Sequence, residues 1–193
     1  MVNNELFFKI RDLRNITRFN KRLLHVNDTV SSHSYYVTVL SLLVSLEYIE
    51  KSGNISINPT SVMSYSLLHD IEESVLGDVL TPTKYRNTEY LNQYNKLKDD
   101  VIDDMLKGNE FLKSVELNEQ EKLVFKFCDM FEAYSTSMEE YYLYGNKQFE
   151  FISSNYKSKI LDFVSVDSHL SAIFATLDSL LLRHVVNGVS NEY

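Results

Sequence analysis

The sequence has few of the residues that interrupt helices and form turns. Its 193 residues include only 2 prolines and 5 glycines, the residue types on which tight turns depend most. A β-rich or loop-rich fold is therefore disfavoured. Hydrophobic residues make up 44% of the chain and charged residues 24%, as in ordinary soluble globular proteins. A chain of this length buries a substantial core within one domain.

Cysteine is almost absent. Cys128 is the single cysteine, so no internal disulfide can form, which fits a reducing compartment. It lies in an apolar stretch, where a thiol is inert rather than nucleophilic. Cysteine-based catalysis is therefore not favoured.

Positive charge is in short supply. The chain has 19 Lys and Arg against 27 Asp and Glu, a formal net charge of −8. Such a surface repels nucleic acid, and we expect no nucleic-acid polymer as a partner. A small phosphorylated ligand needs only a local group of basic residues and is not excluded.

Long hydrophobic runs are also missing. The longest, Tyr35 to Leu46, is too short to span a bilayer and is interrupted by polar residues. The basic residues near the N-terminus are not followed by an apolar segment, so no secretory signal is visible. We expect a cytoplasmic protein without a membrane partner.

Hydrophobic spacing predicts helices along the whole chain. Within 29–51, apolar residues recur at helical intervals, at Val30, Val37, Leu40, Val44 and Tyr48. Further helices are predicted over 58–77, 90–106, 118–144 and 167–186, with a loop over 78–85. The sequence shows no convincing strand alternation and no internal repeat. We predict an all-α fold with a single domain over 1–193, whose motifs lie within 18–146.

Two histidines and two aspartates are the strongest functional signal. His33, the adjacent pair His69-Asp70, and Asp129 offer two imidazoles and two carboxylates, enough to bind one divalent metal ion with positions left for water and substrate. His69 and Asp70 point about 100° apart on a helix, yet both reach an ion near the helix end. Each histidine alone fits a structural role. Apolar residues flank Asp129, so its carboxylate is expected to be paired or metal-bound, and a solvent-facing position is the alternative. Their occurrence together favours a metal site.

A further acidic residue, Glu73, follows His69 by four positions, on the same face if the helix continues. There its carboxylate can accept a proton from water at the metal site. Glu72 is expected to be solvated. Asp78, after Gly77, either accepts a hydrogen bond from a sugar hydroxyl or is simply a turn residue.

Candidates for binding a phosphorylated substrate flank these motifs. Arg18 can bind phosphate through a bidentate fork and Lys84 as a point charge, although both are equally ordinary surface charges. Phe19 either stacks on a base or packs beneath the N-terminal segment. Further cations near the motifs are Lys21, Arg22 and Arg86.

The order of the histidines and aspartates resembles the H…HD…D signature of the HD-domain metal-dependent phosphohydrolases. Longer segments are similar to the YfbR-type 5′-deoxynucleotidases and to phage deoxynucleotide triphosphohydrolases, including dATP-specific enzymes. The most specific segment reads HD-x-x-E-x-x-x-GD-x-x-TP-x-K over residues 69–84. The others are Arg18-Phe19 and the segments 30–34 and 121–134.

The resemblance implies an HD-domain helical bundle that forms a homodimer or a higher homo-oligomer. It implies four ligands of a divalent ion (Co²⁺, Mn²⁺, Mg²⁺ or Zn²⁺), namely His33, His69, Asp70 and Asp129. Glu73 is implied as the catalytic carboxylate. The expected substrate contacts are Arg18 at the phosphate, Asp78 at the deoxyribose, and Phe19, Thr81 and Lys84 around them.

The chain departs from this family at three positions. Ser32 precedes the first metal-binding histidine, where the family usually has an acidic residue, and this bears on how that histidine is oriented. Phe19 replaces a typical tryptophan, which bears on base selectivity. Leu80 replaces a frequent proline in the substrate loop.

These features predict a metal-dependent phosphohydrolase acting on deoxynucleotides. One version is a 5′-deoxynucleotidase, which releases phosphate from a deoxynucleoside monophosphate. The other is a triphosphohydrolase, which releases tripolyphosphate from a deoxynucleoside triphosphate, and the motifs do not choose between them. The alternative is a non-catalytic nucleotide-binding or regulatory module. Such a module is expected to lose ligands, whereas this chain keeps all four together with Glu73.

Overall fold

The computed structural model describes residues 4–79, 81–84, 86–109, 112 and 114–188. Within these ranges there is no strand, only an isolated bridge between Thr17 and Thr29, so the all-α prediction is confirmed. The helices are α1 (Asn4–Asp12), the 3-10 helix η1 (Leu13–Asn15), α2 (Val30–Ser52), α3 (Pro59–Leu68), α4 (Glu73–Leu76), α5 (Thr81–Lys84), α6 (Thr88–Met105), α8 (Glu119–Tyr142), α9 (Gln148–Val164) and α10 (Ser168–Gly188).

Capping residues set the ends of the longest helices. Thr29 and Ser32 form a capping box at the start of α2, in which each side chain accepts the other's backbone N–H. Gly53 ends α2 with φ of 67°, a conformation that glycine adopts without steric cost. Asn118 and Glu121 form a second capping box at the start of α8. Both helices therefore begin at defined residues, which fixes the side chains of their first turns.

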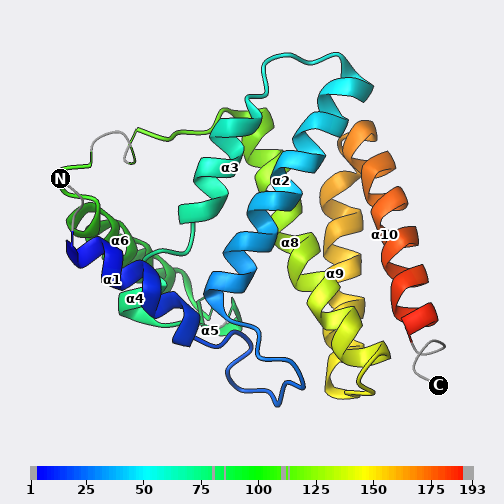
Figure 1. Ribbon diagram of the computed structural model, residues 1–193, viewed down its shortest axis with the longest axis horizontal. Helices are drawn as coiled ribbons and strands as arrows, with labels where there is room; N and C mark the ends of the chain where they lie inside the picture. The colour runs from blue at the N-terminus through cyan, green and yellow to red at the C-terminus, as the bar shows by residue number, and fades with distance from the viewer. Residues whose placement is uncertain (1–3, 80, 85, 110–111, 113, 189–193) are drawn as a thin grey trace.

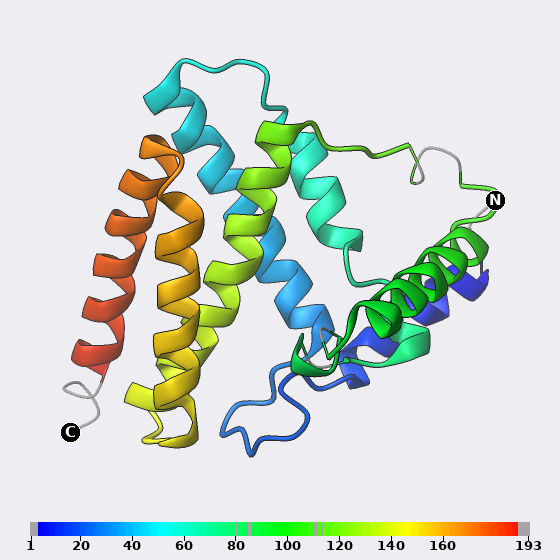
Figure 2. The ribbon, with the colours of Figure 1, turned by 180° about the vertical axis from the view of Figure 1, so that it is seen from behind.

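Helices α2, α3, α8, α9 and α10 pack into a bundle around the main core (Figures 1 and 2). α8 packs against α9, α2 and α3, and α10 packs against α2, α8 and α9. The buried apolar face of α8 carries residues at helical spacing, including Val124, Phe127, Phe131, Tyr134 and Met138. Its neighbouring face, with Asp129 and Glu132, is turned toward α2.

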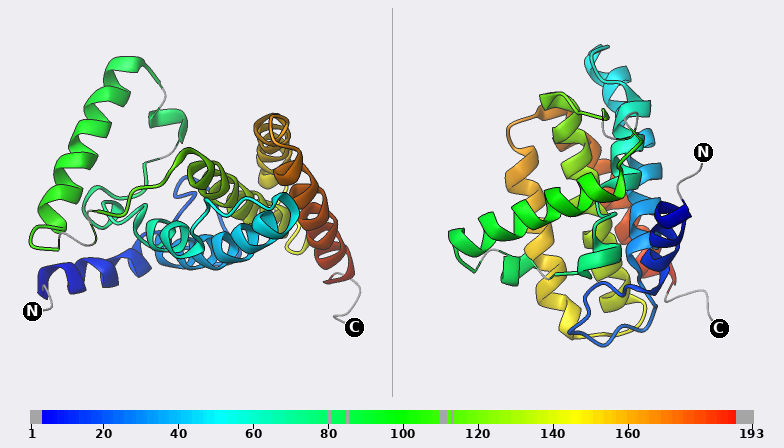
Figure 3. Two further views of the ribbon diagram at one scale, coloured as in Figure 1. Left: turned by 90° about the horizontal axis from the view of Figure 1, so that it is seen from above. Right: turned by 90° about the vertical axis from the view of Figure 1, so that its left-hand side faces the viewer.

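A smaller group of helices lies beside the bundle. It contains α1, α4 and α6, and Figure 3 shows α6 extending away from the bundle. Leu6, Ile71 and Leu106 are buried together, with Leu68 and Ile102 packed against them. Because Leu68 and Ile71 flank the turn after α3, this cluster holds the residues of that turn in place.

One helix, α10, is long and apolar enough to cross a membrane by length and composition alone. In the structure it packs against α2, α8 and α9. A single helix of this kind is weak evidence for a membrane span, since core helices of soluble proteins pass the same test.

Two expectations about secondary structure are wrong, and one observed helix was not expected. The helix predicted over 58–77 ends at Leu68, because the chain turns at 69–72 before the short α4. The predicted loop over 78–85 contains α5. The expected helices also leave out α9, whose start at Lys147 has no side-chain cap. The four other predicted helices lie within two residues of the observed bounds.

Candidate metal centre and active site

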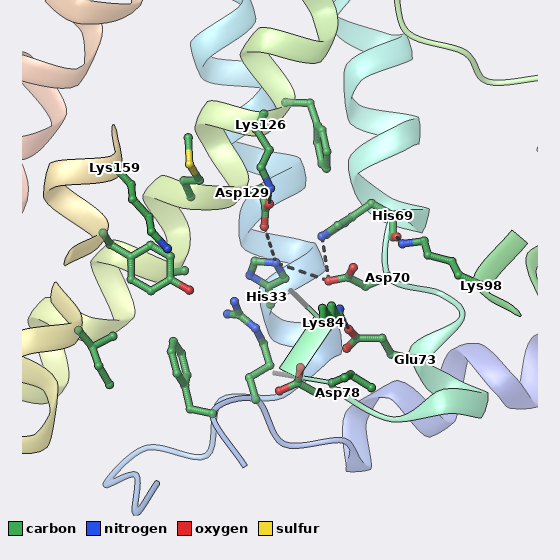
Figure 4. A pocket seen from close by; sticks show the side chains of 18 of the residues that line it. His33, His69, Asp70, Glu73, Asp78, Lys84, Lys98, Lys126, Asp129 and Lys159 are labelled. Carbon is green, nitrogen blue, oxygen red and sulfur yellow. Dashed lines mark hydrogen bonds and ion pairs between the residues drawn. The ribbon is translucent and has the colours of Figure 1, made fainter. Parts of the chain in front are cut away.

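His33 lies in the first turn of α2 and at the centre of the site (Figure 4). Its side chain is 1% exposed. Nε2 lies 3.3 Å from Oδ1 of Asp129 and 3.8 Å from Oδ2 of Asp70. On the other edge of the ring, Nδ1 hydrogen-bonds Oε2 of Glu132. The imidazole is therefore fixed between carboxylates that come from two other parts of the chain.

His69 is the residue at which α3 ends. Its Nδ1 donates a hydrogen bond to the backbone carbonyl of Ser66 at 2.7 Å, which leaves the lone pair on Nε2. Nε2 is buried and has no hydrogen-bond partner among the described residues, although Oδ2 of Asp70 lies 2.9 Å away. Because α3 stops here, His69 and Asp70 both face His33 (Figure 4).

Asp129 reaches the same point from α8. Its Oδ2 accepts a hydrogen bond from Nζ of Lys126 at 2.7 Å, while Oδ1 faces His33. His33, His69 and Asp129 each offer a ligand atom within 4.8 Å of the other two, and Asp70 contacts both histidines. The structure therefore brings all four predicted ligands together.

The charges in this cluster stabilise one another. Burial opposes ionisation of Asp129, but a hydrogen bond from His33 holds the pKa of its carboxyl well below the ordinary value. Burial also opposes ionisation of Asp70, but the charge of His69 lowers the pKa of its carboxyl. Burial and the charge of Arg18 lower the pKa of His33, but the carboxylates at both ring nitrogens outweigh them and raise it to about 9. Two ionised carboxylates therefore face two imidazoles.

The donor set fits a divalent metal ion. Ligand atoms about 2.1 Å from one ion are about 3.0 to 3.5 Å apart in tetrahedral or octahedral geometry. The closest approaches between these groups, 2.9, 3.3 and 3.8 Å, are near that range. Nε2 of His69, buried and lacking a hydrogen-bond partner among the described residues, is an atom that an ion would satisfy. The residues that would hold the ion are His33, His69, Asp70 and Asp129.

Glu73 begins α4 and is buried close to Asp70, although α3 does not continue to it. Nζ of Lys84, from α5, lies 3.5 Å from its Oε1. Burial, followed by the charges of Asp70 and Asp78, raises the pKa of the Glu73 carboxyl, and Lys84 opposes the rise. A carboxylate with a raised pKa is a better proton acceptor, so Glu73 is suited to proton transfer.

Arg18 lies near the Nδ1 edge of His33, whereas the aspartates of the metal site face Nε2. Its Nη1 donates hydrogen bonds to Glu132 at 2.8 Å and to Asp28 at 3.1 Å. Its guanidinium lies over the ring of Phe19, 5.4 Å from the centroid. Phe19 has φ of 50°, which is uncommon for a bulky residue, and packs edge-on against another aromatic ring. These contacts hold residues 18–19 beside the metal site.

These side chains line one cavity of about 920 Å³. A wall that the sequence pattern does not predict comes from α9, which contributes Phe151, Ile152, Asn155, Tyr156 and Lys159. The basic residues around the cavity are Arg18, Arg22, Lys84, Lys98, Lys126 and Lys159. An acidic protein therefore concentrates positive charge where a phosphorylated ligand would bind.

The expectation that Glu72 is solvated is wrong. Its side chain is 0% exposed, and Oε1 lies 2.6 Å from Nζ of Lys98 on α6. The same ammonium group donates to the backbone carbonyl of His69 at 3.1 Å. Because α3 ends early, Glu72 turns toward α6 instead of solvent, and the ion pair supports the turn that carries the metal-site residues.

The remaining predicted substrate contacts lie in or near the loop after α4. Asp78 lines the cavity, and its backbone carbonyl accepts a hydrogen bond from the side chain of Asn20. Lys84 lines the same cavity. Thr81 belongs to α5, but its side chain and all of Leu80 lie outside the described residues.

Two solved structures that share this fold are HD-domain phosphohydrolases. That of Listeria innocua aligns with a TM-score of 0.76 over 96% of this chain and 91% of its own, at 21% identity. The HD phosphohydrolase DatZ of cyanophage S-2L, solved with dA and one catalytic Zn²⁺ ion, aligns with a TM-score of 0.70 over 95% of this chain and 98% of its own, at 14% identity. This chain therefore shares the fold of these HD-domain phosphohydrolases.

Sequence comparison identifies the family within this class. The model of the 5′-deoxynucleotidase YfbR-like family matches residues 5–176. The 5′-deoxynucleotidase of Vibrio vulnificus is 27% identical over 158 residues, which cover 77% of this chain and 80% of the relative. That of Vibrio parahaemolyticus is 29% identical over 131 residues, covering 63% and 66%. The chain therefore belongs to the YfbR-like 5′-deoxynucleotidase family.

Proposed function

We propose that this protein uses a divalent metal ion to hydrolyse deoxynucleoside 5′-monophosphates to deoxynucleosides and phosphate. Membership of a 5′-deoxynucleotidase family supports the monophosphate. The ion is Co²⁺, Mn²⁺, Mg²⁺ or Zn²⁺, since imidazole and carboxylate ligands accept several divalent metals. The observation that carries the proposal is the convergence, beside the buried carboxylate of Glu73, of His33, His69, Asp70 and Asp129.

The side chains around the metal position have separate roles in the hydrolysis. When bound, the ion supplies positive charge that polarises the phosphoryl group and acidifies water. Glu73 accepts a proton from water as the water oxygen bonds to phosphorus. The bond between phosphorus and O5′ then breaks, and O5′ takes the proton that Glu73 accepted from water. Lys84, 3.5 Å from Glu73, balances the charge of that carboxylate, and Arg18 stabilises the phosphoryl oxygens.

The sugar and base lie on the side of the cavity lined by Asp78 and Phe19. The carboxylate of Asp78 accepts a hydrogen bond from a deoxyribose hydroxyl. Phe19 offers an aromatic edge to the base, and Thr81 belongs to the same substrate loop. The phage enzyme of this fold was solved with dA, which makes deoxyadenosine nucleotides the first substrates to test.

A deoxynucleoside triphosphate is the second candidate substrate. Four of the basic residues around the cavity have acidic partners, namely Arg18, Lys84, Lys98 and Lys126. Within the described part of the chain, Arg22 and Lys159 line the cavity without an ion pair. These two cations favour a longer phosphate chain, because each added phosphate brings further negative charge.

Product analysis separates these substrates. Each deoxynucleoside mono- and triphosphate, with ribonucleotides for comparison, is incubated with the protein and each of the four metals, and the products are identified by chromatography. The monophosphatase releases inorganic phosphate, whereas the triphosphohydrolase releases tripolyphosphate. Tight nucleotide binding without turnover under any condition would instead support a non-catalytic module.

We also propose that two copies of the protein associate through α2, which lies on the outer face of the bundle in Figures 1 and 2. Its outward side carries an apolar stripe at helical spacing, composed of Tyr35, Tyr36, Val39, Leu43 and Leu46. These side chains are between 39% and 60% exposed. A contiguous apolar face suits a second copy, because two-fold symmetry sets the same patch against itself.

A further inference from the structure

Glu132 was not among the residues that the sequence motifs single out, yet it contacts both halves of the site. It lies on α8, three positions after Asp129, and its side chain is 8% exposed. A buried carboxylate is costly unless its oxygens are fully hydrogen-bonded. Glu132 is therefore expected to have hydrogen-bond donors at both of its carboxylate oxygens.

Both carboxylate oxygens of Glu132 are used. Oε2 accepts hydrogen bonds from Nδ1 of His33 and from Nη1 of Arg18, the latter at 2.8 Å. Oε1 accepts from the hydroxyl of Thr136 at 3.1 Å, one turn further along α8. Glu132 is thus a hydrogen-bond acceptor with a fixed orientation.

Ser32 cannot provide such a contact, although it precedes His33 directly. Its hydroxyl accepts the backbone N–H of Thr29 at 2.9 Å in the capping box of α2. The same hydroxyl has one proton to donate, and its acceptors are the backbone carbonyl of Thr29 at 2.8 Å and Oδ1 of Asp28 at 3.2 Å. The carboxylate that faces Nδ1 of His33 therefore comes from α8 and not from α2.

We propose that Glu132 is a positioning residue shared by the metal ligand His33 and the phosphate-binding Arg18. By accepting the proton on Nδ1 of His33, it keeps the Nε2 lone pair directed at the metal position. By accepting from Arg18 through the same oxygen, it fixes the guanidinium relative to that position. This inference rests on the proposed function, since it assumes that His33 binds a metal ion.

The test is a metal titration without substrate. The protein is stripped of metal and titrated with Co²⁺, whose visible absorption reports both affinity and ligand geometry. Glu132→Gln keeps the shape of the side chain but removes its charge. Glu139→Gln makes the same change on the same helix, where Glu139 pairs with His184 at the surface and not with the site. Circular dichroism establishes that each variant is folded at the titration temperature.

We expect Glu132→Gln to bind Co²⁺ about 10- to 100-fold more weakly than the wild type, with an altered absorption spectrum, and Glu139→Gln to match the wild type. With metal in excess, Glu132→Gln should also show a raised KM because Arg18 is less firmly held. If Glu132→Gln binds Co²⁺ with wild-type affinity and spectrum, the inference is overturned while the proposed function stands. If the wild-type protein itself binds none of Co²⁺, Mn²⁺, Mg²⁺ and Zn²⁺, the proposed function fails first.

Discussion

At the scale of single residues, the site consists of buried side chains that each serve more than one partner. His33 faces Asp129 with one ring nitrogen and Glu132 with the other, and Asp70 contacts both His33 and His69. Removing one partner leaves a buried charge or donor unmet, which costs more than the contact contributed. Neutral substitutions of similar shape therefore separate the chemistry of a residue from its packing.

Replacing Glu73 by glutamine removes the proposed proton acceptor with little change in shape. We expect kcat to fall by about 100- to 10,000-fold, while affinity for Co²⁺ stays within a factor of a few, since Glu73 is not a proposed ligand. Glu89→Gln, an exposed glutamate on α6, is the matched control and should keep wild-type kcat. Undiminished turnover by Glu73→Gln would contradict the assignment of Glu73 as the base.

Glu140 links stability to pH at a distance from the metal site. It is buried and accepts hydrogen bonds from the backbone of His25 and Val26 and from the side chain of Asn146. Burial alone would raise the pKa of Glu140, but these hydrogen bonds hold it below the ordinary 4.5. Its contribution to stability is therefore complete above the unfolded-state pKa and is lost as pH falls through the folded-state pKa.

Urea unfolding at a series of pH values tests this link. We expect Glu140→Gln to lower the free energy of unfolding by about 1 to 3 kcal/mol at pH 7. The difference from the wild type should shrink as the pH falls below 4.5, the ordinary value for this carboxyl, because protonation then removes the same charge. A difference that stays constant from pH 7 to pH 3 would show that the charge of Glu140 is unimportant.

At the scale of helices, the sequence predicts the bounds of a helix well where capping residues and apolar spacing determine them. α2 and α8 begin at capping boxes, and their apolar residues recur at helical spacing, so their bounds are predictable. α9 is less predictable, because Lys147 at its start provides no side-chain cap and Phe151 is 78% exposed. Phe151 lines the cavity, and that placement is not encoded in the local pattern.

The same distinction separates the predicted site from the parts that the sequence does not reveal. His33, His69, Asp70 and Asp129 belong to motifs with fixed order. Glu132 is an unremarkable acid on α8 until the fold sets it against His33, 99 positions earlier in the chain. Glu72 is adjacent to a predicted catalytic residue, yet whether it faces solvent or Lys98 depends on where α3 ends.

The end of α2 offers a direct test of local control. Gly53 has φ of 67° and no atom within 4 Å of the position that a Cβ would take, so a substitution there meets backbone strain but no clash. We expect Gly53→Ala to lower the free energy of unfolding by about 1 kcal/mol. Gly53→Asn should cost less, since asparagine tolerates this conformation. Equal losses for the two variants in chemical denaturation would argue against a backbone cause.

At the scale of the whole molecule, the cavity joins the two groups of helices. The bundle contributes His33, Asp129 and the wall from α9, while the smaller group contributes Glu73 through α4 and Lys98 through α6. The cavity thus depends on how the two groups pack. Residues from seven helices, α2, α3, α4, α5, α6, α8 and α9, meet there, although only the motif-bearing ones carry the proposed chemistry.

The proposed association through α2 is tested by light scattering coupled to size-exclusion chromatography. Leu43 is 57% exposed within the apolar stripe of α2, and Leu161 is 49% exposed on α9. We expect Leu43→Lys to convert the dimer to a monomer, because a desolvated lysine opposite its own copy repels it, and Leu161→Lys to leave the dimer intact. A wild-type protein that is monomeric at all concentrations, or a dimer unaffected by Leu43→Lys, would contradict this interface.

We propose that the two histidines and two aspartates bind a metal ion on which deoxynucleotide hydrolysis depends. Phosphorus NMR can follow deoxyadenosine monophosphate incubated with metal-free protein and then with each divalent metal added back. We expect no reaction in the metal-free sample and growth of the inorganic phosphate signal once Co²⁺, Mn²⁺, Mg²⁺ or Zn²⁺ is restored. Phosphate release that proceeds equally fast in the metal-free sample would show that the reaction does not need the ion.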